Sequence, residues 1–309
     1  MNARRQADLE WSVFATLAWY GVRGRPLTLP ELQRFLLKNT ATVEQLKPIL
    51  HDARIRHQEG YYFLEANKVR LPTPESLQNY RYKWWRLRLA VSILRHVPYL
   101  RMVGALQTMY DRTVVKPHDI DVLVIAKHGR LFTVRTLVTL SLLMAGLWRH
   151  GTRIANRIDL SWYATTAHLD MEPITRPPYD PLLVFLFAEM APVFDEDDTY
   201  HEFVRANEWI RNYLPAYDGR PHTAARPSGL ARAMERVLAG RTGTALERRL
   251  ERWQLGRIAE NPANPDPDVE IIATAKMLKF HEKERRRKDR ETWEQTMQKL
   301  SFDPKLVQK

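Results

Sequence analysis

The sequence predicts an α+β protein in three parts: an N-terminal domain over residues 1–70, a central sheet with flanking helices over residues 71–172, and a helical C-terminal domain over residues 173–309. Three observations predict it. Three short amphipathic segments precede two β-prone runs near the N-terminus. Two segments with alternating polar and apolar residues follow in the middle of the chain. Amphipathic helical patterns fill the remainder.

The composition favours a folded protein with polyanionic partners. Hydrophobic residues make up 44% of the 309 residues, which allows a sizeable core. The 48 Lys and Arg residues outnumber the 36 Asp and Glu residues, for a net charge of +12. This balance favours nucleic acid or nucleoside triphosphates as partners, although a merely basic surface gives the same balance. The chain contains no Cys, which excludes disulfides and Cys-containing zinc sites.

Nothing in the sequence indicates a membrane or a secretory route. The first residues lack the apolar run of a signal peptide. The most apolar stretch, Leu137–Trp148, is shorter than the about 20 residues that span a bilayer. We therefore expect a cytoplasmic protein without membrane contact.

The N-terminal domain is expected to contain three helices and a hairpin. The first helix covers residues 7–20, and Thr28 with Pro30 predicts the start of the second. A third helix is expected over residues 42–50. Residues 55–64 form two short β-prone runs around a Glu-Gly pair, which is typical of a tight hairpin. This order of elements resembles the winged helix-turn-helix family.

The resemblance implies that the third helix faces a groove of a nucleic acid. Four basic residues lie on that helix or its flank: Lys47, His51, Arg54 and Arg56. The helix itself carries few basic residues, so a winged helix used for protein contact, or a plain helical cap, is the alternative.

The central part begins after the two prolines of Leu71–Pro74, which cannot continue a helix or a strand ladder. A long basic helix follows and extends to His96. The β-prone run Tyr99–Val103 ends at Gly104, and a short helix is expected over residues 106–110. A turn from strand through glycine to helix lets the backbone approach a phosphate and directs helix N–H groups at it.

Two carboxylates begin the next predicted strand, residues 119–125. Asp119 and Asp121 are two residues apart, so they point to the same face of the strand and repel each other unless a cation neutralises them. Mg²⁺ prefers such hard oxygen ligands and completes its shell with water and phosphate oxygens. A third carboxylate, Asp159, alternates with apolar neighbours in the predicted strand over residues 157–163.

The glycine turn, the Asp-x-Asp strand and the later strand aspartate resemble the DNA polymerase β superfamily of nucleotidyltransferases over residues 75–165. The resemblance implies that Asp119, Asp121 and Asp159 hold two Mg²⁺ ions, Asp159 binding the one that activates the attacking hydroxyl. It also implies transfer of a nucleoside monophosphate from a nucleoside triphosphate to an acceptor hydroxyl. The sequence contains no zincin, zinc-deaminase or P-loop pattern.

The sequence differs from the pattern of this family at residue 105, where the family has Ser or Gly and this chain has Ala105. The triphosphate is expected to bind at Gly104 and Ala105. Ala105 cannot donate the hydroxyl hydrogen bond, which is worth about 1.5–3 kcal/mol to a charged acceptor. A catalytically degenerate fold acting as a winged-helix DNA-binding regulator therefore stays open, as does a transferase that modifies a small molecule or a protein. Arg130 and Arg135 begin the predicted helix 130–148, where a phosphate contact and a structural role are equally open.

The C-terminal domain is expected to be helical throughout. Helical patterns cover residues 181–194, 202–214, 226–253 and 270–300, with a proline-rich loop over residues 261–268. The charged centre of the last segment favours a solvated helix face, with a phosphate-backbone contact as the alternative. Asn207 and Trp209 are expected to pack in the interior. His281 is expected on a helix surface, a phosphate contact being the other option.

Overall fold

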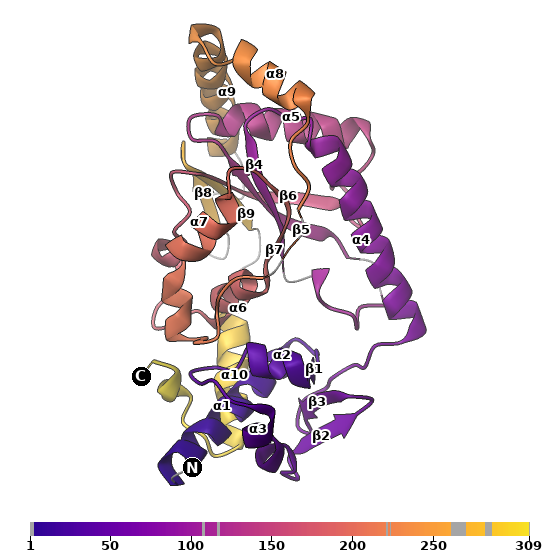
Figure 1. The fold of residues 1–309 in the computed structure, drawn as a ribbon, viewed down its shortest axis with the longest axis vertical. Coiled ribbons are helices and arrows are strands. Elements are labelled where there is room, and N and C mark those ends of the chain that lie inside the picture. Colours follow the sequence, from indigo (N-terminus) through magenta and orange to yellow (C-terminus); the bar gives the residue numbers. More distant parts are fainter. Residues whose placement is uncertain are drawn as a thin grey trace.

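The computed structural model describes residues 3–106, 109–115, 118–220, 222, 224–260, 270–281 and 286–308. These residues fold as a mixed α+β protein with two sheets, a three-stranded sheet in the N-terminal unit and a six-stranded central sheet (Figure 1). The described part of the chain contains no helix with the length and apolar character needed to cross a membrane.

The N-terminal unit contains the predicted helices and hairpin. Its elements are α1 (Ala3–Val22), β1 (Leu27–Thr28), α2 (Leu29–Arg34), α3 (Val43–Leu50), β2 (Ile55–Gln58) and β3 (Tyr61–Leu64). Thr28 and Thr42 each start a helix through a capping box, in which the threonine side chain accepts a backbone N–H from the first turn. Glu59 and Gly60 both have positive φ, as a tight two-residue hairpin turn requires.

Helix α4 (Pro74–Leu94) links this unit to the central sheet. Thr73 caps it and Pro74 occupies the first turn, where its missing N–H costs nothing. Figure 1 shows α4 running along one side of the molecule from the N-terminal unit to the region of the central sheet. The predicted long basic helix is therefore confirmed, and it ends close to the predicted boundary at His96.

The central sheet has the strand order β7-β4-β5-β6-β9-β8. Its strands are β4 (Leu100–Ala105), β5 (Ile120–Ala126), β6 (Ile158–Thr165), β7 (Ala191–Asp195), β8 (Glu270–Ala273) and β9 (Met277–His281). Strands β5 and β6 are parallel, and every other neighbouring pair is antiparallel. The two predicted strands that carry aspartates therefore lie side by side in the middle of the sheet.

The prediction of a wholly helical C-terminal part is wrong at three strands. The apolar segment 181–194 forms α6 (Pro181–Glu189) and then the edge strand β7. Pro192 explains this break, because a residue before proline avoids helical geometry and an edge strand tolerates the missing N–H. The segment 270–300 begins with the hairpin β8–β9, which pairs with β6 and completes the sheet. The predicted loop 261–268 lies outside the described residues.

Helices cover both faces of the central sheet. The remaining ones are α5 (Leu131–Met144), α7 (Thr199–Ala206), α8 (Gly229–Val237), α9 (Arg241–Ala259) and α10 (Arg286–Lys299), with short 3₁₀ turns at Glu172–Ile174, Glu208–Asn212 and Pro304–Gln308. One face of the sheet shares a core with α1–α3, α6 and α10, and the opposite face packs on α4, α5 and α9. Helix α10 ties the two ends of the chain together, because the buried Trp293 donates its indole N–H to the carbonyl of Ala15 at 2.9 Å.

Candidate metal centre

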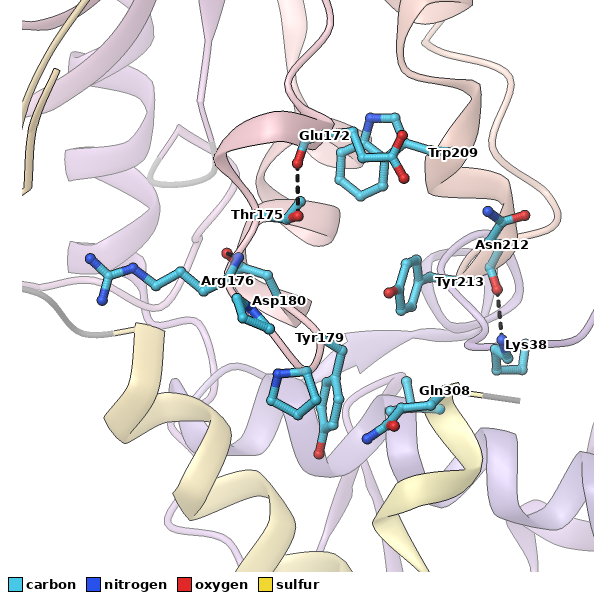
Figure 2. Close-up of a pocket in the computed structure, with 13 residues that line it drawn as sticks. Lys38, Glu172, Thr175, Arg176, Tyr179, Asp180, Trp209, Asn212, Tyr213 and Gln308 are labelled. Atoms are coloured by element: carbon cyan, nitrogen blue, oxygen red, sulfur yellow. Dashed lines mark hydrogen bonds between the residues drawn. The ribbon is translucent and has the colours of Figure 1, made fainter. Parts of the chain in front are cut away.

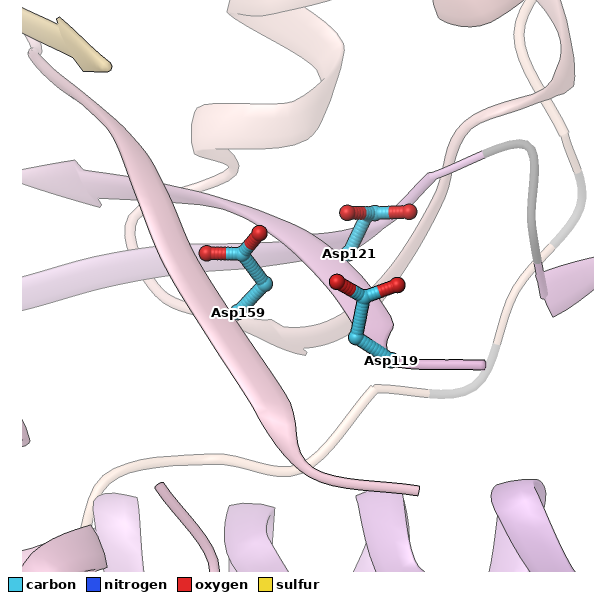
Figure 3. A group of neighbouring side chains, drawn as sticks. All are labelled: Asp119, Asp121 and Asp159. Carbon is cyan, nitrogen blue, oxygen red and sulfur yellow. The ribbon is translucent and has the colours of Figure 1, made fainter. Parts of the chain in front are cut away.

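Three carboxylates meet at one end of strands β5 and β6. Asp119 directly precedes β5, and Asp121 within β5 is paired in register with Asp159 of β6. One oxygen from each side chain lies within 4.8 Å of the others, and Figure 3 shows the three side chains close together. The predicted convergence is therefore confirmed. It arises because parallel neighbours bring their first residues to the same edge of the sheet. We call these three residues the carboxylate centre.

The donor set of the carboxylate centre suits a hard divalent cation. Three carboxylate oxygens are ligands that Mg²⁺ accepts, with water and phosphate oxygens filling the other positions. Two oxygens on opposite sides of one Mg²⁺ can be at most about 4.2 Å apart at ordinary bond lengths. The three oxygens lie within 4.8 Å of one another, which is close to this limit, so one ion or two ions together could contact all three.

Two cations that the sequence did not single out border the carboxylate centre. Arg149 lies 3.2 Å from Asp119 and 2.5 Å from Asp159, and its backbone N–H is held by the carbonyl of Ile158. The buried Lys83 of α4 donates to the backbone carbonyl of Asp119 at 3.1 Å. Both were overlooked because each is one basic residue among many, and only the packing of α4 and of the segment after α5 brings them to the site.

The ionisation of two groups at the centre is shifted. Burial raises the pKa of Asp159, and the neighbouring Asp119 adds to the rise while Arg149 opposes it. Burial also lowers the pKa of Lys83, while the nearby charges of Asp121 and Asp119 oppose this shift. A proton therefore competes with a metal ion for Asp159 at a higher pH than for an ordinary aspartate.

The expected glycine turn is absent at its predicted place, because Gly104 and Ala105 both lie inside β4. Gly104 pairs with Leu123 and with Pro192, so it is a strand residue. A Cβ at position 104 would lie 2.5 Å from Sδ of Met190, so close packing requires this glycine. The end of β4 still adjoins the centre, because the N–H of Leu106 donates to the carbonyl of Asp121 at 3.1 Å. The short helix expected over residues 106–110 lies partly outside the described residues.

Arg130 and Arg135 lie away from the carboxylate centre, so the structure argues against their role as phosphate ligands there. Both follow the end of β5, whereas the aspartates precede it or lie at its start, about 20 Å of strand away. Arg130 donates to the carbonyl of Leu238 at 3.3 Å, and Arg135 donates to Oε1 of Gln254 at 2.6 Å. These contacts dock α5 against the helices that cover it.

The basic residues expected to contact nucleic acid divide into two kinds. Arg54 forms ion pairs with Asp52 and Glu10 at 2.8 and 3.0 Å, and Arg56 pairs with Glu65. Their charge is therefore largely compensated within the N-terminal unit. Lys47 and His51 are exposed, and a ring nitrogen of His51 lies 2.7 Å from the carbonyl of Lys47. The third helix consequently offers little uncompensated positive charge.

Asn207 has the packing role expected of it. Its buried side chain accepts from the N–H of Met171 and donates to the carbonyl of Leu169. Trp209 is half-buried and donates to Asn207 at 3.0 Å. The side chain of His281, which falls in strand β9, lies outside the described residues.

Trp209 also lines a cavity of about 520 Å³ that does not include the carboxylate centre. Figure 2 shows Tyr179, Trp209 and Tyr213 around it, together with Lys38, whose ammonium donates to the carbonyl of Asn212 at 2.8 Å. No local sequence pattern indicates this cavity, because its walls come from four separate segments.

In comparisons with known proteins, no family model, no curated protein and no solved structure matches the chain.

Proposed function

We propose that the protein is a Mg²⁺-dependent nucleotidyltransferase that moves a nucleoside monophosphate from a nucleoside triphosphate to an acceptor hydroxyl. The convergence of Asp119, Asp121 and Asp159 carries the proposal. The sequence of a strand, an Asp-x-Asp strand and a third strand with an aspartate resembles the core of the DNA polymerase β superfamily. The three helices and hairpin of the N-terminal unit resemble a winged helix-turn-helix domain.

In the proposed chemistry, the residues of the carboxylate centre have different roles. Asp119 and Asp121 would hold the cation, and bound Mg²⁺ would supply stabilisation of the charge that develops on the phosphate oxygens. Asp159 would position the acceptor hydroxyl and take its proton, a role that its raised pKa favours. The hydroxyl oxygen bonds to the α-phosphorus, the bond to the bridging oxygen breaks, and pyrophosphate leaves. Arg149 contacts both Asp119 and Asp159.

The decisive test replaces one ligand without changing its size. Asp121→Asn should abolish Mg²⁺-dependent incorporation of label from each of the nucleoside triphosphates labelled at the α-phosphate, because an amide cannot neutralise the cation. Asp8→Asn, an exposed position on α1, is the matched control and should leave incorporation unchanged. Undiminished incorporation by Asp121→Asn would refute the proposal.

A catalytically degenerate core that acts as a winged-helix regulator of DNA is the second candidate. Two observations favour it: Ala105 has no hydroxyl, and the guanidinium of Arg149 already contacts two of the three carboxylates. Thermal unfolding separates the candidates, because a ligand that binds the folded state raises its stability. Stabilisation by Mg²⁺ with a nucleoside triphosphate supports the transferase. No stabilisation, together with salt-sensitive binding of duplex DNA, supports the regulator.

A further inference from the structure

The outer face of α4 carries exposed aromatic side chains, which are unusual on a helix that faces solvent. Tyr82 and Trp85 are 44% and 53% exposed, and Leu89 continues their row at 39%. The rings of Tyr82 and Trp85 are stacked, with centroids 5.6 Å apart. Arg86 lies over the Tyr82 ring at 5.8 Å from its centroid. These contacts hold the two rings in place while about half of each side chain stays exposed to solvent.

A row of arginines runs beside these aromatic side chains. Arg81, Arg88 and Arg95 are exposed and recur every seven residues, so they follow one side of the helix and its C-cap. None of the three forms an ion pair with any residue that the structure describes. The row extends about 21 Å at the helical rise, roughly the length of six stacked nucleotides.

The same helix borders the carboxylate centre. Lys83 follows Tyr82 directly and points inward, where it donates to the carbonyl of Asp119. The aromatic and basic face of α4 therefore begins one residue from a group that touches the centre. Figure 1 shows α4 at the outside of the molecule along most of its length.

We infer that this face of α4 binds single-stranded nucleic acid and leads a terminal hydroxyl to the carboxylate centre, so that the acceptor is a polynucleotide. The inference rests on the proposed function for the acceptor role. Uncompensated arginines bind the phosphate backbone, and exposed aromatic rings stack on bases that a duplex keeps buried. The acceptor surface is thus α4, and the third helix of the N-terminal unit, which carries Lys47 as its only basic residue and is followed by the ion-paired Arg54 and Arg56, is not part of it.

Fluorescence anisotropy of a labelled single strand of about a dozen nucleotides tests the surface directly. Trp85→Ala should weaken binding at least about fivefold, because one stacked base is lost. Arg81→Gln with Arg88→Gln should reduce the slope of log affinity against log salt by about 1.4, or about 0.7 per phosphate contact. All three side chains are exposed, so the variants should keep the thermal unfolding midpoint of the unsubstituted protein.

The matched control, Lys47→Gln with Arg56→Gln, removes two charges from the N-terminal unit and should change neither affinity nor slope. Equal weakening by this control, unchanged binding in Trp85→Ala, or equally tight binding of a duplex would overturn the inference. Binding to phosphatidylserine vesicles without binding to the oligonucleotide would overturn it as well.

Failure of this inference differs from failure of the proposed function. Asp121→Asn should bind the oligonucleotide as tightly as the unsubstituted protein, because α4 is intact. If the single strand binds through Trp85 but never receives label, the acceptor role fails while the binding surface stands, and the transferase proposal is decided separately by the comparison with Asp121→Asn. If label is transferred and Trp85→Ala transfers it equally well, the surface fails and the transferase stands.

Discussion

Two clusters of ionisable side chains in this protein differ in how deeply their charges are buried. The first, which we call the junction cluster, consists of Tyr20, Arg25, Glu31 and Glu189. Oε1 of the fully buried Glu189 accepts from the Tyr20 hydroxyl and from Arg25, both at 2.7 Å. Arg25 also pairs with Glu31 at 3.0 Å, and Glu31 in turn completes the capping box of α2. The cluster therefore joins the N-terminal unit to α6.

The carboxylate centre is arranged differently. Three aspartates lie together at partly exposed positions, and Arg149 contacts two of them while 36% of its own side chain is exposed. Lys83 reaches the backbone of Asp119. The fully buried Glu189 has only neighbouring protein groups to neutralise its charge, chiefly Arg25, whereas a half-exposed group of like charges can also be neutralised by a cation from solvent. The contrast teaches that the junction cluster connects the N-terminal unit to α6, whereas the carboxylate centre could hold a metal ion.

The largest expected effect breaks the junction cluster. Glu189→Gln should lower the free energy of unfolding by about 3 kcal/mol, because it removes one partner of a buried ion pair and leaves Arg25 with only the less buried Glu31 as an ionic partner. Urea unfolding measures this, with Glu44→Gln on the surface of α3 as the control that should change it little. A loss below about 1 kcal/mol would mean that the cluster is not a main connection between the two units.

Next in size is the response of the carboxylate centre to the same kind of change. Asp121→Asn should leave the metal-free protein as stable as before or more so, because it relieves repulsion among carboxylates. It should abolish the stabilisation by Mg²⁺ and nucleoside triphosphate, which reaches about 2.7 kcal/mol when the ligand is at 100 times its Kd. Thermal unfolding with and without the ligands measures both quantities. A destabilised metal-free variant would erase the contrast with the junction cluster.

A smaller effect concerns the guanidinium at the centre. Arg149→Gln should tighten Mg²⁺ binding about two- to fivefold, because it removes a partly exposed cation that competes for Asp119 and Asp159. Isothermal titration calorimetry measures the change, and Arg153→Gln at a nearby exposed position is the matched control. Weaker binding in Arg149→Gln would instead show that this side chain positions the ligands.

The smallest expected effect is a pH dependence. The pKa of Asp159 is raised above its ordinary value of 3.8 in the folded protein. Protonation of Asp159 therefore contributes fully to the stability of the folded protein below about pH 3.8, and this contribution is lost as the pH rises through the raised pKa. Mg²⁺ requires the deprotonated form, so stabilisation by Mg²⁺ should decline on acidification at a pH above 3.8. Unfolding midpoints across a pH series, with and without Mg²⁺, measure the decline. Asp159→Asn should remove it, and a decline centred at the ordinary value would show that burial does not govern this group.

Local patterns predicted several elements well, because their signals lie within a few residues. The capping threonines Thr28 and Thr42 mark helix starts, and the Glu59–Gly60 pair marks the hairpin. The spacing of Asp119 and Asp121 determines that both side chains project from the same face of a strand. What the spacing could not show is that β6, the strand that carries Asp159, is one of the two neighbours of this strand in the sheet.

Other features depended on partners far away in the chain. Gly104 looked like a turn glycine, yet Met190 decides its role by packing against it. The hairpin β8–β9 looked helical in isolation, yet the edge offered by β6 pairs with it. Arg130 and Arg135 looked like phosphate ligands, yet α5 turns them toward the helices that cover it.

By itself, the sequence determined the order of local elements, the absence of cysteine chemistry, the basic balance, and the pairing of two carboxylates on one strand face. The tertiary structure alone decided that Asp159 lies in register with Asp121 and that Arg149 and Lys83 border the carboxylate centre. It also decided that the exposed arginines of α4 have no ionic partners among the described residues, whereas Arg54 and Arg56 form ion pairs. The physical reason is the separation along the chain over which each kind of interaction acts. Backbone preference and periodicity act over a few residues, whereas strand pairing and charge compensation join residues that only the folded chain brings together.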